Sequence, residues 1–249
     1  MIRFPLAATL ALGLTAAPAL AVDLNAMTDA ERAAFRAEVR AYLLENPEII
    51  LEAVQQLEQR QAEAQAQADF TLVADNAQEL FEDGYSWVGG NPDGDITVVE
   101  FLDYRCGFCR RAHPEVERLL REDGNIRLIV KEFPILGEAS EISSRFAIAT
   151  RQVAGGDAYK AVHDQLIEMA GDPNAAVLRR MATGLALDAD AILAAMDSDA
   201  VNEELARTRA LAQRLQINGT PSFVVHDELL RGFLPADQMA VMIADKRAP

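Results

Sequence analysis

The stretch VVEFLDYRCGFC, residues 98–109, contains the only two cysteines of the 249-residue chain, separated by two residues. An apolar and largely β-branched run precedes them, which predicts a buried strand over residues 96–101. The residues from Cys106 onward predict a helix that ends at Gly124. Three interpretations of the cysteines are open at this point: two buried thiols, half of a metal site, or a reactive dithiol.

The N-terminus predicts an export signal. Arg3 gives a positive start, residues 6–14 form an apolar run, and Ala19-Leu20-Ala21 has the small-x-small pattern typical of a cleavage site. We therefore expect a signal peptide over residues 1–21 and a mature protein in the periplasm. A membrane anchor is the weaker alternative, because the run is shorter than the roughly 20 apolar residues that span a bilayer.

The charge of the chain argues against one class of function. There are 39 Asp and Glu against 23 Lys and Arg, which gives a net charge of −16. A protein that binds nucleic acid needs a basic surface to neutralise phosphates. Nucleic acid is therefore not expected as a partner.

The cysteine pair predicts chemistry rather than cross-linking. A disulfide that closes a two-residue gap removes almost no chain entropy, so it would stabilise little. At a helix N-terminus, however, unpaired N–H groups and the helix dipole can lower a thiol pKa from about 8.5 to roughly 3.5–7.5. We expect Cys106 to be the attacking thiolate and Cys109 to resolve the mixed disulfide, with Gly107 and Phe108 tuning the thiolate.

Metal and haem sites fit the same residues less well. A structural zinc site usually has four ligands, whereas this chain offers one cysteine pair and three histidines, His113, His163 and His226. Haem attachment needs a histidine directly after the second cysteine, where Arg110 stands. Neither a cofactor nor a metal is therefore expected.

Residues 22–75 predict a helical extension. Thr28 and Glu31 form a capping box for a first helix, and Asn46-Pro47 separates it from a second. The second helix carries a 4-3-4-3-4 spacing, which is typical of helix association, at Ile50, Val54, Leu57, Gln61, Ala64 and Ala68. A homo-oligomer through residues 22–75 is one expectation; a helix that packs on its own domain or a solvated stalk is the other.

Residues 76–249 predict one α/β domain with a mixed sheet. Turn-forming residues at 84–94 indicate a loop before the first strand. The later elements are a strand within 125–133, a helical insertion at about 138–215, a strand within 219–225, its hairpin partner at 228–232 and a helix over 236–245. Asp172-Pro173 is expected to open one helix of the insertion, and Asp188 to cap the next.

Four stretches carry a resemblance to a known family: Gly90 to Asp95, Val99 to Cys109, KEFPILG at 131–137 and INGTP at 217–221. Together they resemble the thioredoxin-fold disulfide oxidoreductases of the DsbA family, and within it the ScsC-like branch. The resemblance covers most of residues 24–245. It implies a thioredoxin-like fold with a helical insertion, preceded by an N-terminal α-helical extension.

The resemblance also implies roles for distant residues. Glu100 matches a buried acid that moves protons to or from Cys109, although an ordinary solvent-exposed strand-end residue is the alternative. Lys131 resembles a lysine paired with that acid, which would offset the cost of burying a charge. Thr220-Pro221 matches a turn with a cis peptide bond that faces the cysteines and holds a substrate strand.

Two further positions follow from the same resemblance. Pro114 matches a proline that kinks the first active-site helix, so His113 is expected on the helix surface rather than as a ligand. Strongly oxidising members have a histidine between the cysteines, where this chain has Gly107-Phe108. Its absence predicts a milder redox couple.

The sequence therefore predicts an exported thiol–disulfide oxidoreductase that acts on protein substrates and is recharged by a membrane redox partner. We favour an isomerase or reductase, because the predicted seam could bring several active sites together and the inter-cysteine histidine is missing. A monomeric DsbA-like dithiol oxidase is the first alternative. A non-catalytic chaperone or a Cu(I)-binding protein that uses Cys106 and Cys109 is the alternative of another class.

Overall fold

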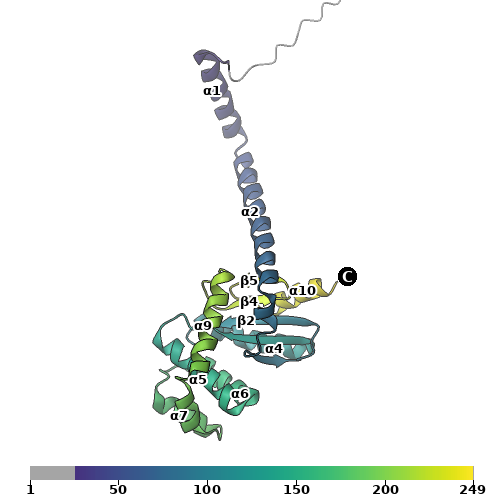
Figure 1. The fold of residues 1–249 in the computed structure, drawn as a ribbon. Coiled ribbons are helices and arrows are strands. Elements are labelled where there is room, and N and C mark those ends of the chain that lie inside the picture. The colour runs from purple at the N-terminus through teal and green to yellow at the C-terminus, as the bar shows by residue number, and fades with distance from the viewer. Residues whose placement is uncertain (1–25, 249) are drawn as a thin grey trace, which may run out of the picture. The chain divides into compact units, whose positions relative to one another are not determined.

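A computed structural model describes residues 26–248 of the chain (Figure 1). The predicted signal peptide, residues 1–21, lies outside the described residues. The chain forms two compact units that meet between Gln59 and Arg60, and each is described here by itself. None of the helices within residues 26–248 combines the length and the apolar character of a membrane span.

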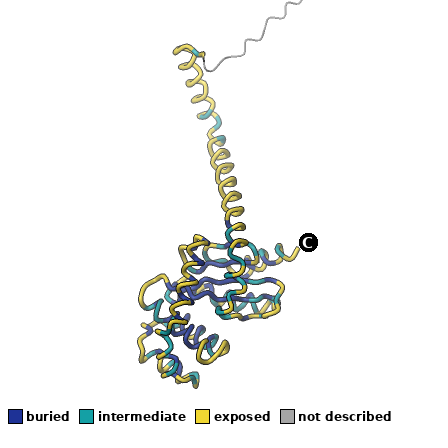
Figure 2. Tube along the Cα trace, in the orientation of Figure 1, coloured by how far each residue is buried: buried dark blue, intermediate teal, exposed yellow. Residues whose placement is uncertain are grey.

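The first unit contains helix α1 (Asp29–Glu45) and the start of helix α2 (Glu48–Asp75). The predicted capping box is confirmed, because the Glu31 N–H donates to the Thr28 hydroxyl and the Thr28 N–H donates to the Glu31 carboxylate, at 3.3 and 2.8 Å. The predicted break at Asn46 is also present. No residue of α1 is buried (Figure 2).

The boundary between the units lies inside α2 rather than near residue 76, where the sequence predicts it. Residues 60–75 belong to the second unit. Arg231 donates to both carboxylate oxygens of Asp69, at 2.5 and 2.8 Å, and Val73 is buried in the core of that unit. This part of α2 therefore packs on its own domain, as the alternative interpretation of the helix expects.

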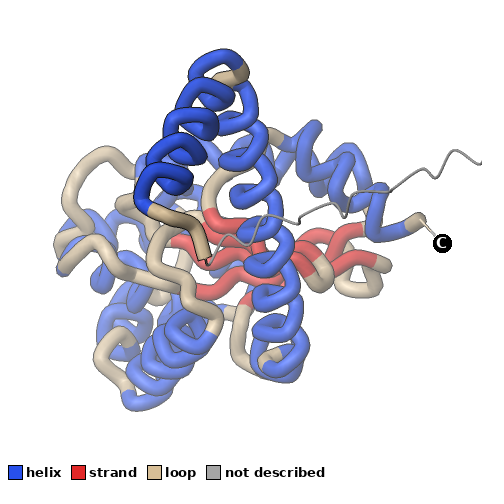
Figure 3. The backbone as a smooth tube through the Cα atoms, turned by 90° about the horizontal axis from the view of Figure 1, so that it is seen from above, coloured by secondary structure: helices blue, strands red, loops and turns tan. Residues whose placement is uncertain are grey.

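The second unit is built on one five-stranded mixed sheet of order β1-β3-β2-β4-β5 (Figure 3). The strands are β1 (Trp87–Gly90), β2 (Ile96–Leu102), β3 (Ile126–Glu132), β4 (Ser222–Val225) and β5 (Glu228–Arg231). Strands β2 and β3 are parallel, and the other neighbouring pairs are antiparallel. The predicted mixed sheet and its terminal hairpin are confirmed.

Strand β1 differs from the prediction, which has a loop over residues 84–94. It pairs with β3 at the sheet edge. Two glycines make it look like a turn in the sequence, but Gly89 lies under the ring of Trp87, where a Cβ would come within 2.0 Å of the ring atoms. The glycine is therefore a packing requirement of the strand and not a sign of a turn.

Eight helices of the second unit follow α2: α3 (Ala77–Phe81), α4 (Gly107–Asp123), α5 (Glu138–Ala154), α6 (Gly156–Glu168), α7 (Ala175–Gly184), α8 (Ala189–Ala195), α9 (Asp199–Arg214) and α10 (Ala236–Arg247). Helices α5 to α9 are the predicted insertion. Asp188 caps α8 by accepting the Ala191 N–H at 3.0 Å, as predicted. Helix α7 starts later than expected and is capped by Asn174 instead of opening at Asp172-Pro173.

The two faces of the sheet are covered by different helices. Side chains alternate along β2, so Val98 and Leu102 belong to one buried cluster and Val99 and Phe101 to another. We call the side of Val98 the α4 face, because α4, α10 and most of the insertion cover it. We call the other side the α9 face, because it lies under the end of α2, α3 and the C-terminal part of α9.

Candidate functional site

The two cysteines lie where strand β2 ends and helix α4 begins. Cys106 is the N-cap residue of α4, and Cys109 lies in the first turn. Both are reduced thiols, with 6% and 1% of their surface exposed. The predicted strand–dithiol–helix arrangement is confirmed.

The surroundings of the two thiols shift their pKa values in opposite directions. Hydrogen bonds from the Cys109 thiol, from Thr220 and from the backbone N–H groups of Cys109 and Phe108 lower the pKa of Cys106 to about 5, although burial opposes them. The pKa of Cys109 is raised by its hydrogen bond to Cys106, by burial and by the charge of Glu100. Near neutral pH, Cys106 is therefore the thiolate and Cys109 holds its proton.

The Thr220-Pro221 peptide is cis and lies against Cys106. The protonated Cys106 thiol donates to the Thr220 carbonyl oxygen, with 3.1 Å between Sγ and O. While Cys106 is a thiol, the buried Thr220 hydroxyl has no hydrogen-bond partner within residues 26–248. It can donate to the Cys106 thiolate, and this is the Thr220 hydrogen bond that lowers the pKa of Cys106. The structure thus brings together a loop and a dithiol that are 114 residues apart in sequence.

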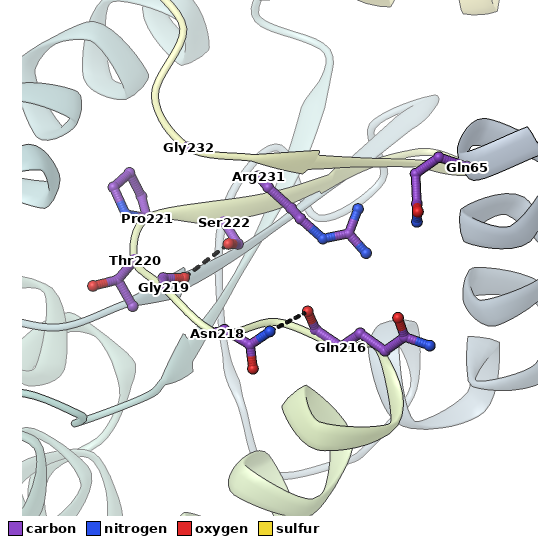
Figure 4. Close-up of a pocket in the computed structure, with 9 residues that line it drawn as sticks. All are labelled: Gln65, Gln216, Asn218, Gly219, Thr220, Pro221, Ser222, Arg231 and Gly232. Atoms are coloured by element: carbon purple, nitrogen blue, oxygen red, sulfur yellow. Dashed lines mark hydrogen bonds between the residues drawn. The ribbon is translucent and has the colours of Figure 1, made fainter. Parts of the chain in front are cut away.

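A groove of about 550 Å³ begins at this turn (Figure 4). Figure 4 shows the side chain of Arg231 between the Thr220-Pro221 turn and Gln65 of α2. The groove is lined by Gln65, Gln216, Asn218, Gly219, Thr220, Pro221, Ser222, Arg231 and Gly232. It could hold an extended polar segment next to Cys106.

Glu100 is a buried acid on the α4 face, with 5% of its surface exposed. The alternative of a solvent-exposed strand-end residue is therefore wrong. Burial first, and then the charges of Glu117 and Glu132, raise the pKa of Glu100 to about 8. No hydrogen bond to its carboxyl group occurs within residues 26–248, so no partner offsets the burial.

Lys131 does not pair with Glu100. In the parallel register, Lys131 is opposite Phe101 and Glu100 is opposite Val130, so the two charged side chains point to opposite faces of the sheet. On the α9 face the Lys131 ammonium forms an ion pair with Asp83 and donates to the Glu79 carbonyl oxygen at 2.7 Å. The predicted Glu100–Lys131 pair is therefore wrong, because β-strand alternation separates them.

The acid that shares the α4 face with Glu100 is Glu132, which the sequence analysis misses. Tyr104 and Tyr159 donate to its carboxylate at 2.7 and 2.6 Å. Burial raises the pKa of Glu132 to about 7, although these hydrogen bonds oppose it. The signal was available, since strict alternation along β3 places Glu132, and not Lys131, on the face of Glu100 and Val130.

Asp103 is a second residue that the sequence analysis misses. It is fully buried, and its carboxylate accepts the N–H groups of Ile135 and Leu136 at 2.8 and 3.0 Å. These contacts tie the loop after β3 to the residues that lead into Cys106. No local pattern predicts them, because the partners are more than 30 residues apart.

The dithiol is flanked by an exposed aromatic side chain. Gly107 and Phe108, the residues between the cysteines, are both exposed. The guanidinium of Arg111 lies 4.2 Å from the centre of the Phe108 ring. Phe108 is therefore presented to solvent in a supported position, where a partner chain could contact it.

The sequence predicts that His113 lies on the helix surface. In the structure its side chain is instead largely buried, and its Nε2 lies 3.4 Å from an Asp164 carboxylate oxygen. The His163 ring is also near, with 5.2 Å between the two ring centres. Within residues 26–248, His113, His163 and Asp164 are the one cluster of three such side chains with metal-ligating spacing.

Comparison with known proteins agrees with the fold. Residues 97–244 match the family described as the DSBA-like thioredoxin domain, and residues 31–64 match the N-terminal domain of the copper resistance protein ScsC. The chain is similar to the crystal structure of a thioredoxin-like oxidoreductase from Silicibacter pomeroyi, with 44% identity and a TM-score of 0.63. That match covers 69% of this chain and 98% of the other.

Two further crystal structures also extend over the N-terminal helices. ScsC of Proteus mirabilis in a transitional conformation is 26% identical, covers 89% of this chain and 97% of its own, and has a TM-score of 0.63. BcfH of Salmonella enterica Typhimurium is 26% identical and has a TM-score of 0.72, and the match covers 88% of this chain and 97% of BcfH. Among curated relatives, the chain spans about a fifth of the length of an Na⁺/H⁺ antiporter NhaA of Salinispora tropica, at 28% identity. The DSBA-like match covers more than half of the chain, and the ScsC match covers its N-terminal helices. The chain therefore belongs to the DsbA-like thioredoxin-domain family as a ScsC-like member.

Proposed function

We propose that the chain is an exported thiol–disulfide oxidoreductase that exchanges disulfides with protein substrates through Cys106 and Cys109. One observation carries this proposal: the surroundings lower the pKa of Cys106 to about 5 and raise that of Cys109. A structural thiol pair gains nothing from such a difference. An attacking thiolate next to a protonated resolving thiol is what disulfide exchange needs.

The reaction runs in two steps. The Cys106 thiolate attacks one sulfur of a substrate disulfide; one S–S bond breaks, a mixed disulfide forms, and the other substrate sulfur leaves as a thiolate. Cys109 then loses its proton and attacks Cys106, which releases the second substrate thiolate and leaves a Cys106–Cys109 disulfide. The substrate gains two electrons. In isomerisation, another substrate thiolate attacks the mixed disulfide first, and Cys106 is released reduced.

Glu100 is proposed to accept the proton that Cys109 must lose. It lies on the α4 face under the dithiol, and its charge contributes to the raised pKa of Cys109. A carboxyl group with a pKa of about 8 exchanges protons readily near neutral pH. Lys131 has no part in this step, because it is bound to Asp83 on the other face.

Thr220 and Pro221 are proposed to hold the substrate chain. When Cys106 is ionised, the Thr220 carbonyl oxygen no longer receives the S–H and can accept an N–H from an extended substrate segment. Pro221 has no N–H that would compete for a substrate carbonyl. Gly107 and Phe108 would contact the substrate from the side of α4.

The direction of electron flow is proposed to favour isomerisation or reduction. The first unit exposes large apolar side chains that could join copies of the chain, and several active sites facing one substrate help an isomerase. These side chains are Phe35, Val39, Tyr42, Leu44, Ile50, Leu51, Val54 and Leu57. A periplasmic location and a membrane redox partner belong to the same proposal.

Refolding of a scrambled disulfide-bonded protein tests the function. The reduced protein should restore its activity, and Cys106→Ser should abolish this. Cys109→Ser should accumulate a mixed disulfide on Cys106 that a reductant removes. Retained activity in Cys106→Ser would overturn the proposal and favour the chaperone or Cu(I)-binding alternative, whereas an equilibrium potential near about −120 mV would favour the dithiol oxidase.

Light scattering tests the assembly. The intact mature protein should be an oligomer, and Ile50→Glu/Val54→Glu/Leu57→Glu should make it monomeric and slow isomerisation. The control Gln55→Glu/Gln56→Glu adds charge to the same helix away from the apolar seam and should leave the oligomer intact. A monomeric parent protein would contradict this part of the proposal and leave a monomeric oxidase or reductase.

A further inference from the structure

Apart from the dithiol, a cluster of side chains with metal-binding geometry lies between helices α4 and α6. His113 comes from α4, and His163 and Asp164 come from α6, which packs on α4. One potential ligand atom from each residue lies within 4.8 Å of the other two. The separation of 3.4 Å between His113 Nε2 and Asp164 Oδ1 equals the spacing of about 3.4 Å between two donors that bind one tetrahedral Zn²⁺ at 2.0–2.1 Å.

A hydrogen bond from a buried polar network holds the ring of His163 and leaves one of its nitrogens available to a metal. When Glu132 is ionised, Tyr104 uses its one hydroxyl hydrogen to donate to Glu132, so its oxygen accepts a hydrogen from His163 Nδ1, 3.1 Å away. In that state the proton is assigned to Nδ1, and Nε2 has a free lone pair. Hydrogen bonding of the distal ring nitrogen to a buried polar network is the usual support of a metal-bound histidine.

The other nitrogen of His163 is free to bind a ligand. The residue is 5% exposed, and no hydrogen bond to its Nε2 occurs within residues 26–248. A metal ion can therefore take the lone pair of this nitrogen without displacing a hydrogen bond.

Access and charge are suitable for a cation. The Asp164 side chain is 40% exposed, so an ion can enter from solvent and keep a water molecule as a fourth ligand. Lys160 now binds both Asp164 oxygens at 2.7 Å and would compete with a metal. It has a second partner in Glu117, at 3.2 Å, which can retain it when Asp164 turns to the ion.

We propose that His113, His163 and Asp164 form a binding site for a divalent transition-metal ion such as Zn²⁺, separate from the dithiol. Two imidazoles and a carboxylate suit borderline divalent ions rather than Cu(I), which favours thiolates. The ion would link the helix that carries Cys106 and Cys109 to the helical insertion. His113 lies one helical turn after Cys109, so the site is placed to stabilise the active-site helix.

Metal titration of a tag-free protein tests the site. All proteins carry Cys106→Ser/Cys109→Ser, which removes the thiol ligands. We expect one saturable equivalent of Zn²⁺ by equilibrium dialysis, and bound Co²⁺ should show the visible absorption of a tetrahedral site. His113→Gln and Asp164→Asn should each weaken binding by roughly tenfold or more. Circular dichroism of each variant should match that of the parent.

Two controls make the result specific. His226→Gln changes the remaining histidine, in the β4–β5 turn, and should leave the affinity unchanged. Lys160→Gln removes the competing ammonium and should strengthen binding. The proposal is overturned if Zn²⁺ does not saturate one site, if the His113 and Asp164 variants bind as the parent does, or if His226→Gln abolishes binding.

Discussion

The two faces of the sheet differ in whether a buried charged residue has a partner. On the α9 face, Lys131 has an ion-pair partner in Asp83 and a carbonyl acceptor in Glu79. On the α4 face, Glu100 has no hydrogen-bond partner within the described residues, and its charged neighbours, Glu117 and Glu132, are also acids. The α9 face compensates its charge, whereas the α4 face leaves its acid without a partner among these residues and with a pKa raised to about 8.

This difference separates structural from reactive chemistry. A compensated buried charge is tolerated by the fold, and removing one partner leaves the other unpaired. Uncompensated ones have strongly perturbed pKa values and gather at functional sites. The α4 face carries the dithiol together with Glu100 and Glu132, two acids whose raised pKa values suit proton transfer near neutral pH.

Replacing Glu100 should have the largest effect on the free energy of unfolding. The pKa of Glu100 is about 8 in the folded protein against an ordinary 4.5, so the folded state binds more protons and stability falls as the pH rises from about 4.5 to 8. At about 1.4 kcal/mol for each pKa unit, the loss is on the order of 5 kcal/mol. Glu100→Gln should therefore be more stable than the parent by up to that amount at pH 9 and equal to it near pH 4.

Urea unfolding of the reduced proteins between pH 4 and 9 measures this effect. Glu122→Gln, on the exposed side of α4, is the matched control and should unfold as the parent does at every pH. If Glu100→Gln kept the pH dependence of the parent, the buried acid of the α4 face would have to be partnered after all.

Breaking the ion pair between Lys131 and Asp83 on the α9 face should have the second-largest effect on stability. Lys131→Met leaves Asp83 buried without its partner, which should lower the free energy of unfolding by about 3–5 kcal/mol at pH 7. Lys131→Met/Asp83→Asn should recover part of the loss. Thiolate absorbance of Cys106 should still titrate near pH 5, because the pair lies on the other face; a large change in this titration would contradict the separation of the two faces.

A smaller effect is expected at the second acid of the α4 face. Tyr159→Phe removes one of the two hydroxyl donors to Glu132, which should cost about 1.5–3 kcal/mol of stability and raise the pKa of Glu132 further above 7. Tyr42→Phe, at an exposed position of α1, is the control and should change stability by less than about 0.5 kcal/mol. Unchanged stability in Tyr159→Phe would show that Tyr104 alone satisfies Glu132.

The smallest expected value is the coupling between the two faces. In a double-mutant cycle, the effects of Glu100→Gln and Lys131→Met on unfolding should add within about 0.5 kcal/mol, since the side chains share no partner. A coupling energy well above 1 kcal/mol would support the pair that the family resemblance implies and would contradict the observed register.

Much of the fold follows from local signals. The run over residues 96–101 predicts β2, Gly124 ends α4, and Asp188 caps α8, because each signal acts within a few residues of the chain. Strand β1 escapes prediction because Trp87 packs over Gly89, a contact that composition cannot reveal. The boundary between the two units cannot be located from the sequence either, because Asp69 contacts Arg231 only in the folded domain.

The dithiol can be recognised from local signals alone, because two cysteines spaced by one helical turn, after a buried strand and at a helix N-terminus, need no distant information. The groups that surround it depend on how the chain packs. Strand register placed Glu100 and Lys131 on opposite faces, the Thr220 carbonyl came to 3.1 Å from Cys106, and α6 brought His163 to His113. The physical reason is that spacing along one chain sets the direction of a side chain within its own element, whereas its partners depend on how separate elements pack.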